Sequence, residues 1–349
     1  MDVSHAKITA NAFKEVNVTD VVAKAPTTSI PAPELPNSTL VDESKPVVAI
    51  LLCTHHGGQF LAEQLDSIQN QEHRHHHIWA SDDGSKDDTH QILEQYQPDW
   101  GKERFSIHSG PEEGYVANFL SLICFSDIQA EYFAYADQDD IWEPDKLSRA
   151  IAKLECVPNN IPALYCSRTR LIDDNGKYIG FSPLFDKPPG FANALIQNIG
   201  GGNTMVMNKA ARDVFRAAGE KTVAGHDWWA YMLITGVGGS VFYDPYPTVQ
   251  YRQHDNNLVG SNGNWYARLL RIKLLLNGRF RNWNNMNIQA LQQNSKLLTA
   301  ENQRILDEFC TARDRWLIPR LFGIWKSGIY RQTLMGNLGL IAATILKKL

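Results

Sequence analysis

The feature that most constrains the fold is an apolar run, Tyr132–Ala136, that leads directly into a cluster of three aspartates. The run itself predicts a short buried strand. The carboxylates of Asp137, Asp139 and Asp140 repel one another, and a divalent metal with hard oxygen ligands would compensate their charge. Because open α/β sheets bind ligands where their strands end, this position favours a metal and diphosphate site. A solvated acidic turn is the alternative interpretation.

A second pair of acids follows another apolar run. Asp82 and Asp83 come directly after Ile78–Ser81. Two strand-end acid pairs in one sheet favour a site for a nucleotide and a metal over an ordinary acidic turn. The earlier run Val47–Cys53 is continuous and rich in β-branched residues, which is typical of a central parallel strand.

Strands and helices alternate along the first half of the chain. Segments with apolar residues at helical spacing separate these runs, and a further short strand is expected at Arg104–His108. The alternation predicts an α/β fold with a Rossmann-like, mostly parallel sheet flanked by helices. In the second half, Val241–Tyr243 and Thr248–Tyr251 predict short strands, and Leu171–Ile179 predicts a hairpin around an Asn-Gly turn.

Composition divides the chain into three parts. Residues 1–45 are rich in Pro, Thr, Ser and Ala and predict a disordered or loosely structured tail. Residues 46–262 hold the α/β pattern, and residues 263–349 predict a C-terminal helical extension. Apolar stretches lie near basic side chains in that extension, at Trp265–Leu276 and Leu334–Leu346. Both contact with a membrane surface and packing on the α/β domain fit them, and neither approaches the roughly 20 residues that span a bilayer.

Charge and cysteine content narrow the classes of function. A net charge of −4 argues against a general nucleic-acid binder. The five cysteines are scattered and without zinc spacing, which suits a reducing compartment. The N-terminus has no basic segment followed by an apolar stretch, as a signal peptide would. We therefore expect a cytoplasmic protein, at most peripheral on the inner face of the cell membrane.

Four histidines, His73 and His75–His77, cluster before the second strand. A metal site is one interpretation. In an extended segment, however, successive rings point to opposite faces, and no acidic partner is near in sequence. A structural role is favoured.

Two glycine- and tryptophan-containing segments are candidate binding regions. Gly201, Gly202 and Asn203 fit either close approach of the backbone to a ligand or an ordinary loop. In His226–Trp229, Trp228 offers a flat apolar surface for a sugar ring, and Asp227 is placed to act as a general base. The alternative is that Asp227 only caps a helix that begins at Trp228.

A cation and an imidazole follow the last expected strand. Arg252 and His254 lie in the polar segment Tyr251–Asn257, which could close over a diphosphate.

The order of these motifs over residues 47–260 resembles the family-2 glycosyltransferases of GT-A fold. The resemblance is strongest to the bacterial rhamnosyltransferase-like branch, which builds cell-surface polysaccharides such as O-antigen and capsule. It is carried by four motifs: Leu52-Cys53-Thr54 with Gly57, Asp82-Asp83-Gly84-Ser85, Asp137-Gln138-Asp139-Asp140-Ile141-Trp142, and His226-Asp227-Trp228-Trp229 with Tyr251-Arg252-Gln253-His254. One departure is that His55-His56 stand where this branch often has Tyr-Asn.

The resemblance implies a role for each residue singled out. Asp227 would be the catalytic base, and Asp139 and His254 would hold a divalent metal, Mn²⁺ or Mg²⁺. The nucleotide and diphosphate of the donor would contact five residues, Thr54, Asp82, Asp83, Asp137 and Arg252. The acceptor or sugar would contact six, Trp142, Gly201, Gly202, Asn203, His226 and Trp228.

The chemistry implied is a single inverting displacement. A nucleotide-sugar is the donor, with dTDP-rhamnose as the first expectation. The acceptor is a saccharide, which a membrane-surface tail would suit if it were linked to polyprenyl diphosphate.

Two other functions remain open on the sequence. A nucleotidyltransferase also uses a parallel sheet and metal-binding acids, but it favours Arg and Lys in the loop after the first strand, and Thr54–Gly58 contains neither. A non-catalytic sugar-binding module would be favoured by the loss of Asp139 or Asp227, and both are present.

Overall fold

The computed structural model describes residues 44–253 and 278–349. The strands are β1 (Val48–Thr54), β2 (His76–Asp82), β3 (Phe105–Ser109), β4 (Tyr132–Ala136), β5 (Ile141–Trp142), β6 (Ala163–Ile172), β7 (Tyr178–Phe181), β8 (Val206–Asn208) and β9 (Ser240–Arg252). The helices that cover them are α1 (Leu61–Gln69), α2 (Thr89–Trp100), α3 (Tyr115–Cys124), α4 (Lys146–Leu154), α5 (Phe191–Ala194), α6 (Lys209–Ala218) and α7 (His226–Gly236). The C-terminal helices are α9 (Arg279–Gln293), α10 (Ala300–Asp314), α11 (Leu317–Lys326) and α12 (Leu334–Ile345), and η1 (Gly202–Thr204) and η2 (Ser295–Leu297) are short 3₁₀ turns.

All nine strands form one sheet in the order β3-β2-β1-β4-β8-β6-β9-β5, with β7 beside β6. The four strands β3, β2, β1 and β4 are parallel, as the alternating sequence pattern predicts. The second half is mixed, because β8 runs antiparallel between β4 and β6 and β5 runs antiparallel to β9. The expected hairpin is present as β6 and β7.

The two strands expected at Val241–Tyr243 and Thr248–Tyr251 are instead one strand, β9. Its pairing with β6 jumps from Asp244 to Pro247, so Pro245 and Tyr246 bulge out of the ladder. Proline has no N–H to donate, and a bulge lets the strand continue past it. The sequence pattern was interrupted there although the strand was not.

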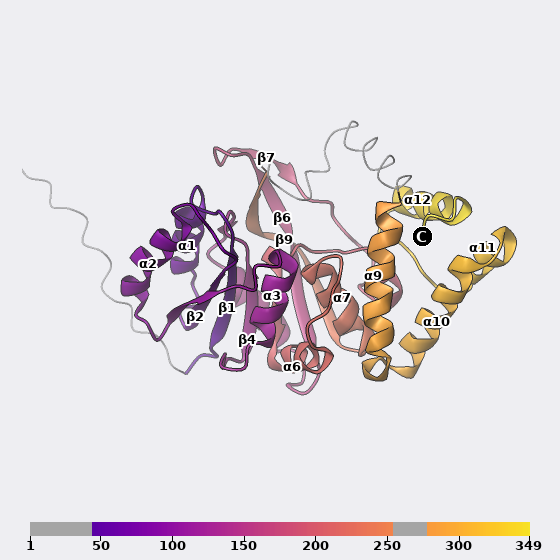
Figure 1. Ribbon diagram of the computed structural model, residues 1–349, viewed down its shortest axis with the longest axis horizontal. Coiled ribbons are helices and arrows are strands. Elements are labelled where there is room, and N and C mark those ends of the chain that lie inside the picture. The colour runs from indigo at the N-terminus through magenta and orange to yellow at the C-terminus, as the bar shows by residue number, and fades with distance from the viewer. Residues whose placement is uncertain (1–43, 254–277) are drawn as a thin grey trace, which may run out of the picture. The chain divides into compact units, whose positions relative to one another are not determined.

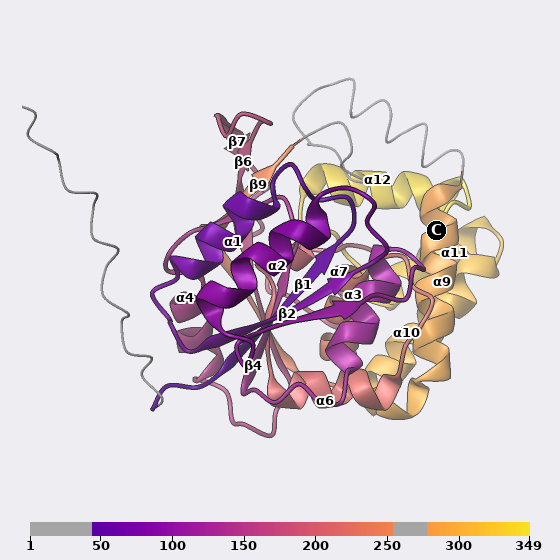
Figure 2. The ribbon, with the colours of Figure 1, turned by 60° about the vertical axis from the view of Figure 1, so that its left-hand side comes forward.

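Helices cover both faces of the sheet (Figures 1 and 2). Alternate residues of β1 belong to two different cores: Val48, Ile50 and Leu52 pack with α1 and α4, whereas Ala49 and Leu51 pack with α3 and α7. Burial on both faces explains why this strand is apolar throughout rather than at every second position.

Helix α7 is apolar on all sides because it is enclosed. It lies between the sheet and the C-terminal helices (Figure 1), and Trp229, Tyr231 and Leu233 are all inaccessible to solvent. The backbone N–H of Thr299, at the start of α10, donates to the carbonyl of Gly236 at 3.1 Å. The C-terminal helices therefore complete the core on this side.

The register of the parallel strands fixes the position of the strand-end acids. Thr54 pairs with Asp82, and Leu52 pairs with Ala136, the residue before Asp137. Asp82 and Asp137 therefore lie at strand ends on the same side of the sheet, the carboxyl ends of β2 and β4, with β1 between them. At the usual spacing of neighbouring strands their backbones are about 10 Å apart.

The clustered histidines pin the start of the sheet. The ring of His73 donates to the carbonyl of Pro46 at 2.9 Å, that of His75 to Lys45 at 2.6 Å, and that of His76 to His73 at 2.7 Å. These contacts give the cluster a structural role.

Several expectations lie outside the described residues. They concern residues 1–43 of the tail, His254 and the stretch Trp265–Leu276. Among the residues that are described, no helix is both long and apolar enough to cross a membrane.

Candidate active site

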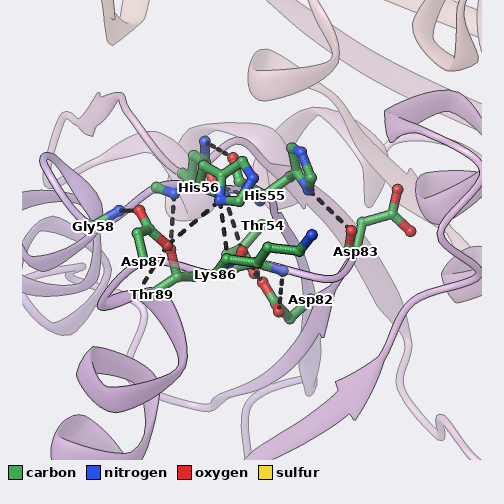
Figure 3. A network of polar contacts seen from close by, with 12 residues as sticks. Thr54, His55, His56, Gly58, Asp82, Asp83, Lys86, Asp87 and Thr89 are labelled. Carbon is green, nitrogen blue, oxygen red and sulfur yellow. Dashed lines mark hydrogen bonds and ion pairs between the residues drawn. The ribbon is translucent and has the colours of Figure 1, made fainter.

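The loop after β1 is joined to the loop after β2 through the carboxylate of Asp82 (Figure 3). Thr54 Oγ1 and Ser85 Oγ donate to Asp82 Oδ1 at 2.8 and 2.5 Å, and the Ser85 backbone N–H donates to Oδ2 at 3.0 Å. Three donors hold the carboxylate in one orientation. Thr54 and Asp82, both expected at the nucleotide, are thus brought together.

Asp83 has a different environment from Asp82. Its oxygens accept the backbone N–H groups of Glu112 and Gly114 at 2.6 and 2.9 Å, and the residue is only 7% exposed. The carbonyl of Asp83 also contacts His55 Nδ1 at 2.9 Å (Figure 3). The Asp83 side chain therefore holds the loop before α3, and its placement does not support the expected contact with the nucleotide.

The acidic loop after β4 is fastened at three points. Gln138 exchanges two hydrogen bonds with the backbone of His55, at 2.8 and 3.0 Å. Asp140 is fully buried and accepts from Asn203 Nδ2 at 2.5 Å and from the Arg252 backbone N–H at 3.2 Å. The loop, η1 and β9 are thereby tied together. Asp139 lies between the two fastened residues, Gln138 and Asp140, and Asp137 directly precedes them.

Arg252 is part of this fastening. Its guanidinium donates to the Asp139 carbonyl at 3.1 Å, to the Asp174 carbonyl at 3.0 Å and to Glu63 Oε2 at 2.5 Å. The residue is 1% exposed. Arg252 was expected to bind the diphosphate, and its burial does not support that role. It positions the acidic loop instead.

Asp227 lies in the first turn of α7 and Gly225 is the N-cap residue, so the alternative in which Asp227 only caps the helix is wrong. Asn198 Nδ2 donates to Asp227 Oδ2 at 2.8 Å, and the Trp228 backbone N–H contacts Oδ1 at 2.7 Å. Burial raises the pKa of Asp227 to about 6, against these hydrogen bonds, which favour the ionised form. A carboxylate with this pKa can accept a proton near neutral pH.

Asp137, Asp139 and Asp227 lie near enough to affect one another's ionisation. The pKa of Asp137 rises to about 8, first through burial and then through repulsion by Asp139 and Asp227. Burial raises the pKa of Tyr251, and so do Asp140, Asp137, Asp139 and Asp227. The pKa of Tyr115 is also raised, first by burial and then by Asp227 and Asp137.

Tyr115 and Tyr251 border this acidic site. Tyr115 was not predicted, and Tyr251 was named only as part of longer segments such as Tyr251–Asn257, without a role of its own. A role for Tyr251 could have been found, because in a strand it shares a face with the buried Val249, and it directly precedes Arg252. Tyr115 has only one signal in the sequence, its position directly after a Gly that starts a helix.

Trp142 is only 2% exposed and lies in the core beneath the site. The ammonium of Lys146, itself fully buried, lies 3.3 Å from the centre of its indole ring. This placement does not support the expected contact between Trp142 and an acceptor. Burial lowers the pKa of Lys146, while Asp140 and Asp137 oppose that shift, so the cation is a buried partner of the acidic loop.

The residues beside Asp227 form a packed wall. His226 is 4% exposed, stacks on Phe119 with ring centroids 4.0 Å apart, and has no hydrogen-bond partner for either ring nitrogen among the described residues. Burial lowers its pKa to about 3, so the ring is neutral. A side chain at Gly202 would overlap the His226 ring, which explains this glycine.

The other residues expected at the acceptor have structural contacts. Trp228 is 8% exposed, and its Nε1–H donates to the Ala194 carbonyl at 2.7 Å. Asn203 is committed to Asp140. A Cβ at Gly201 would meet Asn203 Oδ1 at 2.6 Å. These contacts do not support a sugar-stacking role for Trp228.

The acidic site fits a divalent cation by its charge. Within residues 44–253 and 278–349, no group of three or more His, Cys, Asp or Glu side chains is already arranged around one metal position. Repulsion by Asp139 and Asp227 nevertheless adds to burial in raising the pKa of Asp137, while Lys146 opposes it, so a further cation at this site would be favourable. Aspartate oxygens are ligands that Mg²⁺ and Mn²⁺ accept.

Comparison with known proteins identifies the family. The profile of "Glycosyl transferase family 2" matches residues 49–213. The dTDP-rhamnosyl transferase RfbG of Shigella flexneri is 31% identical over 244 residues, which are 66% of this chain and 81% of that protein.

Solved structures with lower similarity include TarS of S. aureus with UDP-GlcNAc, at 14% identity and TM-score 0.47, covering 81% of this chain and 92% of that one. Another is the mannosyltransferase PcManGT of Pyrobaculum calidifontis with GDP-Man and Mn²⁺, at 14% identity and TM-score 0.48, covering 87% and 86%. The sheet flanked by helices, with further helices at its C-terminal end, is the GT-A fold class that the sequence predicts. The chain belongs to glycosyltransferase family 2 and is similar to its rhamnosyltransferases.

Proposed function

We propose that this glycosyltransferase is metal-dependent and inverting, and that it extends a bacterial cell-surface polysaccharide. The convergence of Asp137, Asp139 and Asp227 on one site carries the proposal. The 31% sequence identity with a dTDP-rhamnosyl transferase supports dTDP-rhamnose as the first donor to test. The acceptor is a saccharide, linked to polyprenyl diphosphate in the cytoplasmic leaflet, so the enzyme works in the cytoplasm at the inner membrane face.

The donor nucleoside lies at the carboxyl ends of β1 and β2. Thr54 and Asp82 are held together there, and Asp82 has its orientation fixed by Ser85. A carboxylate that is already oriented can bind ribose or base hydroxyl and N–H groups without losing conformational entropy. The span of about 10 Å from Asp82 to Asp137 suits a nucleoside whose diphosphate reaches the acidic loop.

Asp139 would hold Mn²⁺ or Mg²⁺, with Asp137 beside it and His254 as the expected further ligand. When bound, the cation neutralises the charge that develops on the leaving nucleoside diphosphate. Arg252 and Gln138 act on this step only by keeping the loop in place.

Asp227 performs the proton transfer. Its carboxylate takes the proton of the acceptor hydroxyl as that oxygen forms a bond to the anomeric carbon. The bond from this carbon to the diphosphate oxygen breaks at the same time, and its electron pair leaves with the nucleoside diphosphate. One displacement from the opposite face inverts the anomeric configuration. Burial, which raises the pKa of Asp227 to about 6, makes it a stronger base than an exposed aspartate.

The test is transfer by the Asp227→Asn variant. Loss of a general base costs about 10²- to 10⁴-fold in rate, and donor binding measured by calorimetry with Mn²⁺ should be retained, because Asp227 does not touch the nucleoside. Asp213→Asn, at an exposed position on α6, is the matched control and should transfer normally. Transfer by Asp227→Asn at the parent rate would refute the assignment.

A further inference from the structure

The last two helices present an unusual amount of apolar surface. Eighteen large apolar side chains are at least 37% exposed among the described residues, and eleven of them lie between 316 and 346. Single exposed apolar residues are ordinary, but a concentration of this kind marks a surface that another body covers. We name α11, α12 and the segment that joins them the C-terminal face.

On α11 the exposed residues form one stripe. Ile318, Phe322 and Trp325 follow the helical spacing and are 64, 59 and 76% exposed. The opposite side of the helix is anchored, because Arg320 is 6% exposed and donates from Nη1 to the Thr344 carbonyl at 2.7 Å. The stripe therefore belongs to a helix packed on α12.

Helix α12 repeats the arrangement. Leu334, Leu338, Ile341 and Ile345 lie along one side and are 76, 51, 50 and 49% exposed. The other side is buried, with Ala343 at 2%. Two neighbouring helices thus each have one side in the protein core and one apolar side outward.

The charge of this segment indicates what covers it. Residues 315–349 contain six Lys and Arg and no Asp or Glu, in a chain whose net charge is −4. Arg315 and Lys347 are exposed, and the Lys326 side chain is 58% exposed while it pairs with Glu308. An apolar surface whose own segment carries only basic side-chain charge complements an anionic lipid bilayer, where Trp is favoured at the headgroup level.

We propose that the C-terminal face docks on the surface of an anionic phospholipid bilayer, with the apolar stripes of α11 and α12 entering the headgroup and upper acyl region. Helices of 10 and 12 residues are suited to lie in this interface. The biological use of this docking rests on the proposed function, because an enzyme held at the membrane meets a lipid-linked acceptor by diffusion in two dimensions.

The test is sedimentation of the full chain with vesicles. We expect binding to phosphatidylcholine vesicles that contain phosphatidylglycerol, and little to phosphatidylcholine alone. Phe322→Ser with Trp325→Ser should weaken binding at least tenfold. Tyr178→Ser with Ile179→Ser removes apolar side chains of similar exposure, 52 and 49%, from β7 and should bind as the parent does. Lys347→Gln and Lys348→Gln should each cost about fivefold.

Three results would overturn the proposal. The first is failure of the parent to bind anionic vesicles, and the second is an equal loss of binding in the β7 control. The third is a parent that does not bind vesicles but is a dimer by light scattering, which Phe322→Ser with Trp325→Ser converts to a monomer. The last result would assign the face to a second copy of the chain. Circular dichroism melts check that the variants fold. Vesicle binding uses neither donor, metal nor Asp227, and soluble-donor turnover should be unchanged in the C-terminal variants, so this test and that of the proposed function can fail separately.

Discussion

Asp227 has two opposing influences on its charge. Burial disfavours the carboxylate and raises its pKa to about 6, whereas Asn198 and the Trp228 backbone N–H stabilise it. The result is a carboxylate that is ionised at neutral pH yet basic enough to accept a proton, as the proposed role requires. Asp140, by contrast, accepts hydrogen bonds from Asn203 and from the Arg252 backbone, and it holds the acidic loop in place.

Transfer should therefore lose rate on the acid side. Protonation of Asp227 removes the base, so kcat/KM at saturating Mn²⁺ should fall about tenfold per pH unit below its midpoint. A cation bound beside Asp227, as proposed, would favour the ionised form and place the midpoint at or below about 6. A pH profile of transfer measures it, with donor affinity at each pH as the control. A rate that stays constant down to pH values near 4 would contradict the role of Asp227.

The same pKa affects stability in the metal-free protein. Folding raises the pKa of Asp227 from 3.8 to about 6, so the folded state holds this proton more tightly than the unfolded chain. The stabilisation of the folded state by this proton is fully present below about pH 4 and is lost as pH rises through about 6. Asp227→Asn should therefore unfold with higher free energy at pH 7, on the order of 1–2 kcal/mol. Urea unfolding of both proteins at pH 4 and 7 measures this, and a variant less stable than the parent at pH 7 would contradict it.

At the scale of elements, the site is made by loops that meet rather than by any one motif. The loop after β4 is tied to the loop after β1 by Gln138, to η1 by Asp140 and to β9 by Arg252. Helix α7 then brings Asp227 to the same place from the other side of η1. Close packing between η1 and the His226 ring sets that distance.

Gly202→Ala tests this packing. The added methyl would overlap the His226 ring, which is enclosed by Phe119 and Tyr135 and has little room to move. Overpacking should cost about 1–3 kcal/mol in thermal unfolding and should also lower kcat, because Asn203 and Asp140 shift with η1. Gly339→Ala in α12 is the control: nothing lies within 4 Å of its Cβ, and it should gain about 0.5–1 kcal/mol. Equal melting of Gly202→Ala and the parent would show that η1 does not need this glycine.

Local patterns sufficed for the parallel strands of the first half and for the strand-end acids, but not for β9, which the bulge at Pro245 and Tyr246 made look like two strands. Burial on both faces leaves a continuous apolar run, and the acids directly follow such runs at Asp82 and Asp137. The role of Arg252 could not be predicted, because its partners Asp140 and Glu63 are 112 and 189 positions away. Trp142 lies on a strand of two residues, too short to have a period that distinguishes inward from outward.

At the scale of the whole molecule, charge is unevenly distributed. Carboxylates gather at the strand ends, and the last 35 residues carry only basic charge. A metal at the acidic site would relieve repulsion that is stronger in the folded state, since unfolding separates Asp227 from Asp137 and Asp139. Binding of such a cation must therefore stabilise the fold.

Mn²⁺ should raise the melting temperature of the parent. At a hundredfold excess over the dissociation constant, the added stability is about 2.7 kcal/mol, which corresponds to several degrees for a protein of this size. Asp139→Asn should abolish most of this shift, and EDTA should reverse it. His75→Gln, in the histidine cluster, should leave it intact. A shift that survives in Asp139→Asn and disappears in His75→Gln would place the metal elsewhere.

One cation and one base are proposed to meet at the carboxyl end of β4. Anomalous scattering at the manganese edge, from crystals soaked with Mn²⁺ and a nucleoside diphosphate, tests it most directly. We predict a single strong peak in contact with the Asp139 carboxylate, with the diphosphate on the side of Asp82 and the Asp227 carboxylate across from it. A peak remote from Asp139, or a nucleotide bound with its diphosphate away from the acidic loop, would contradict the account.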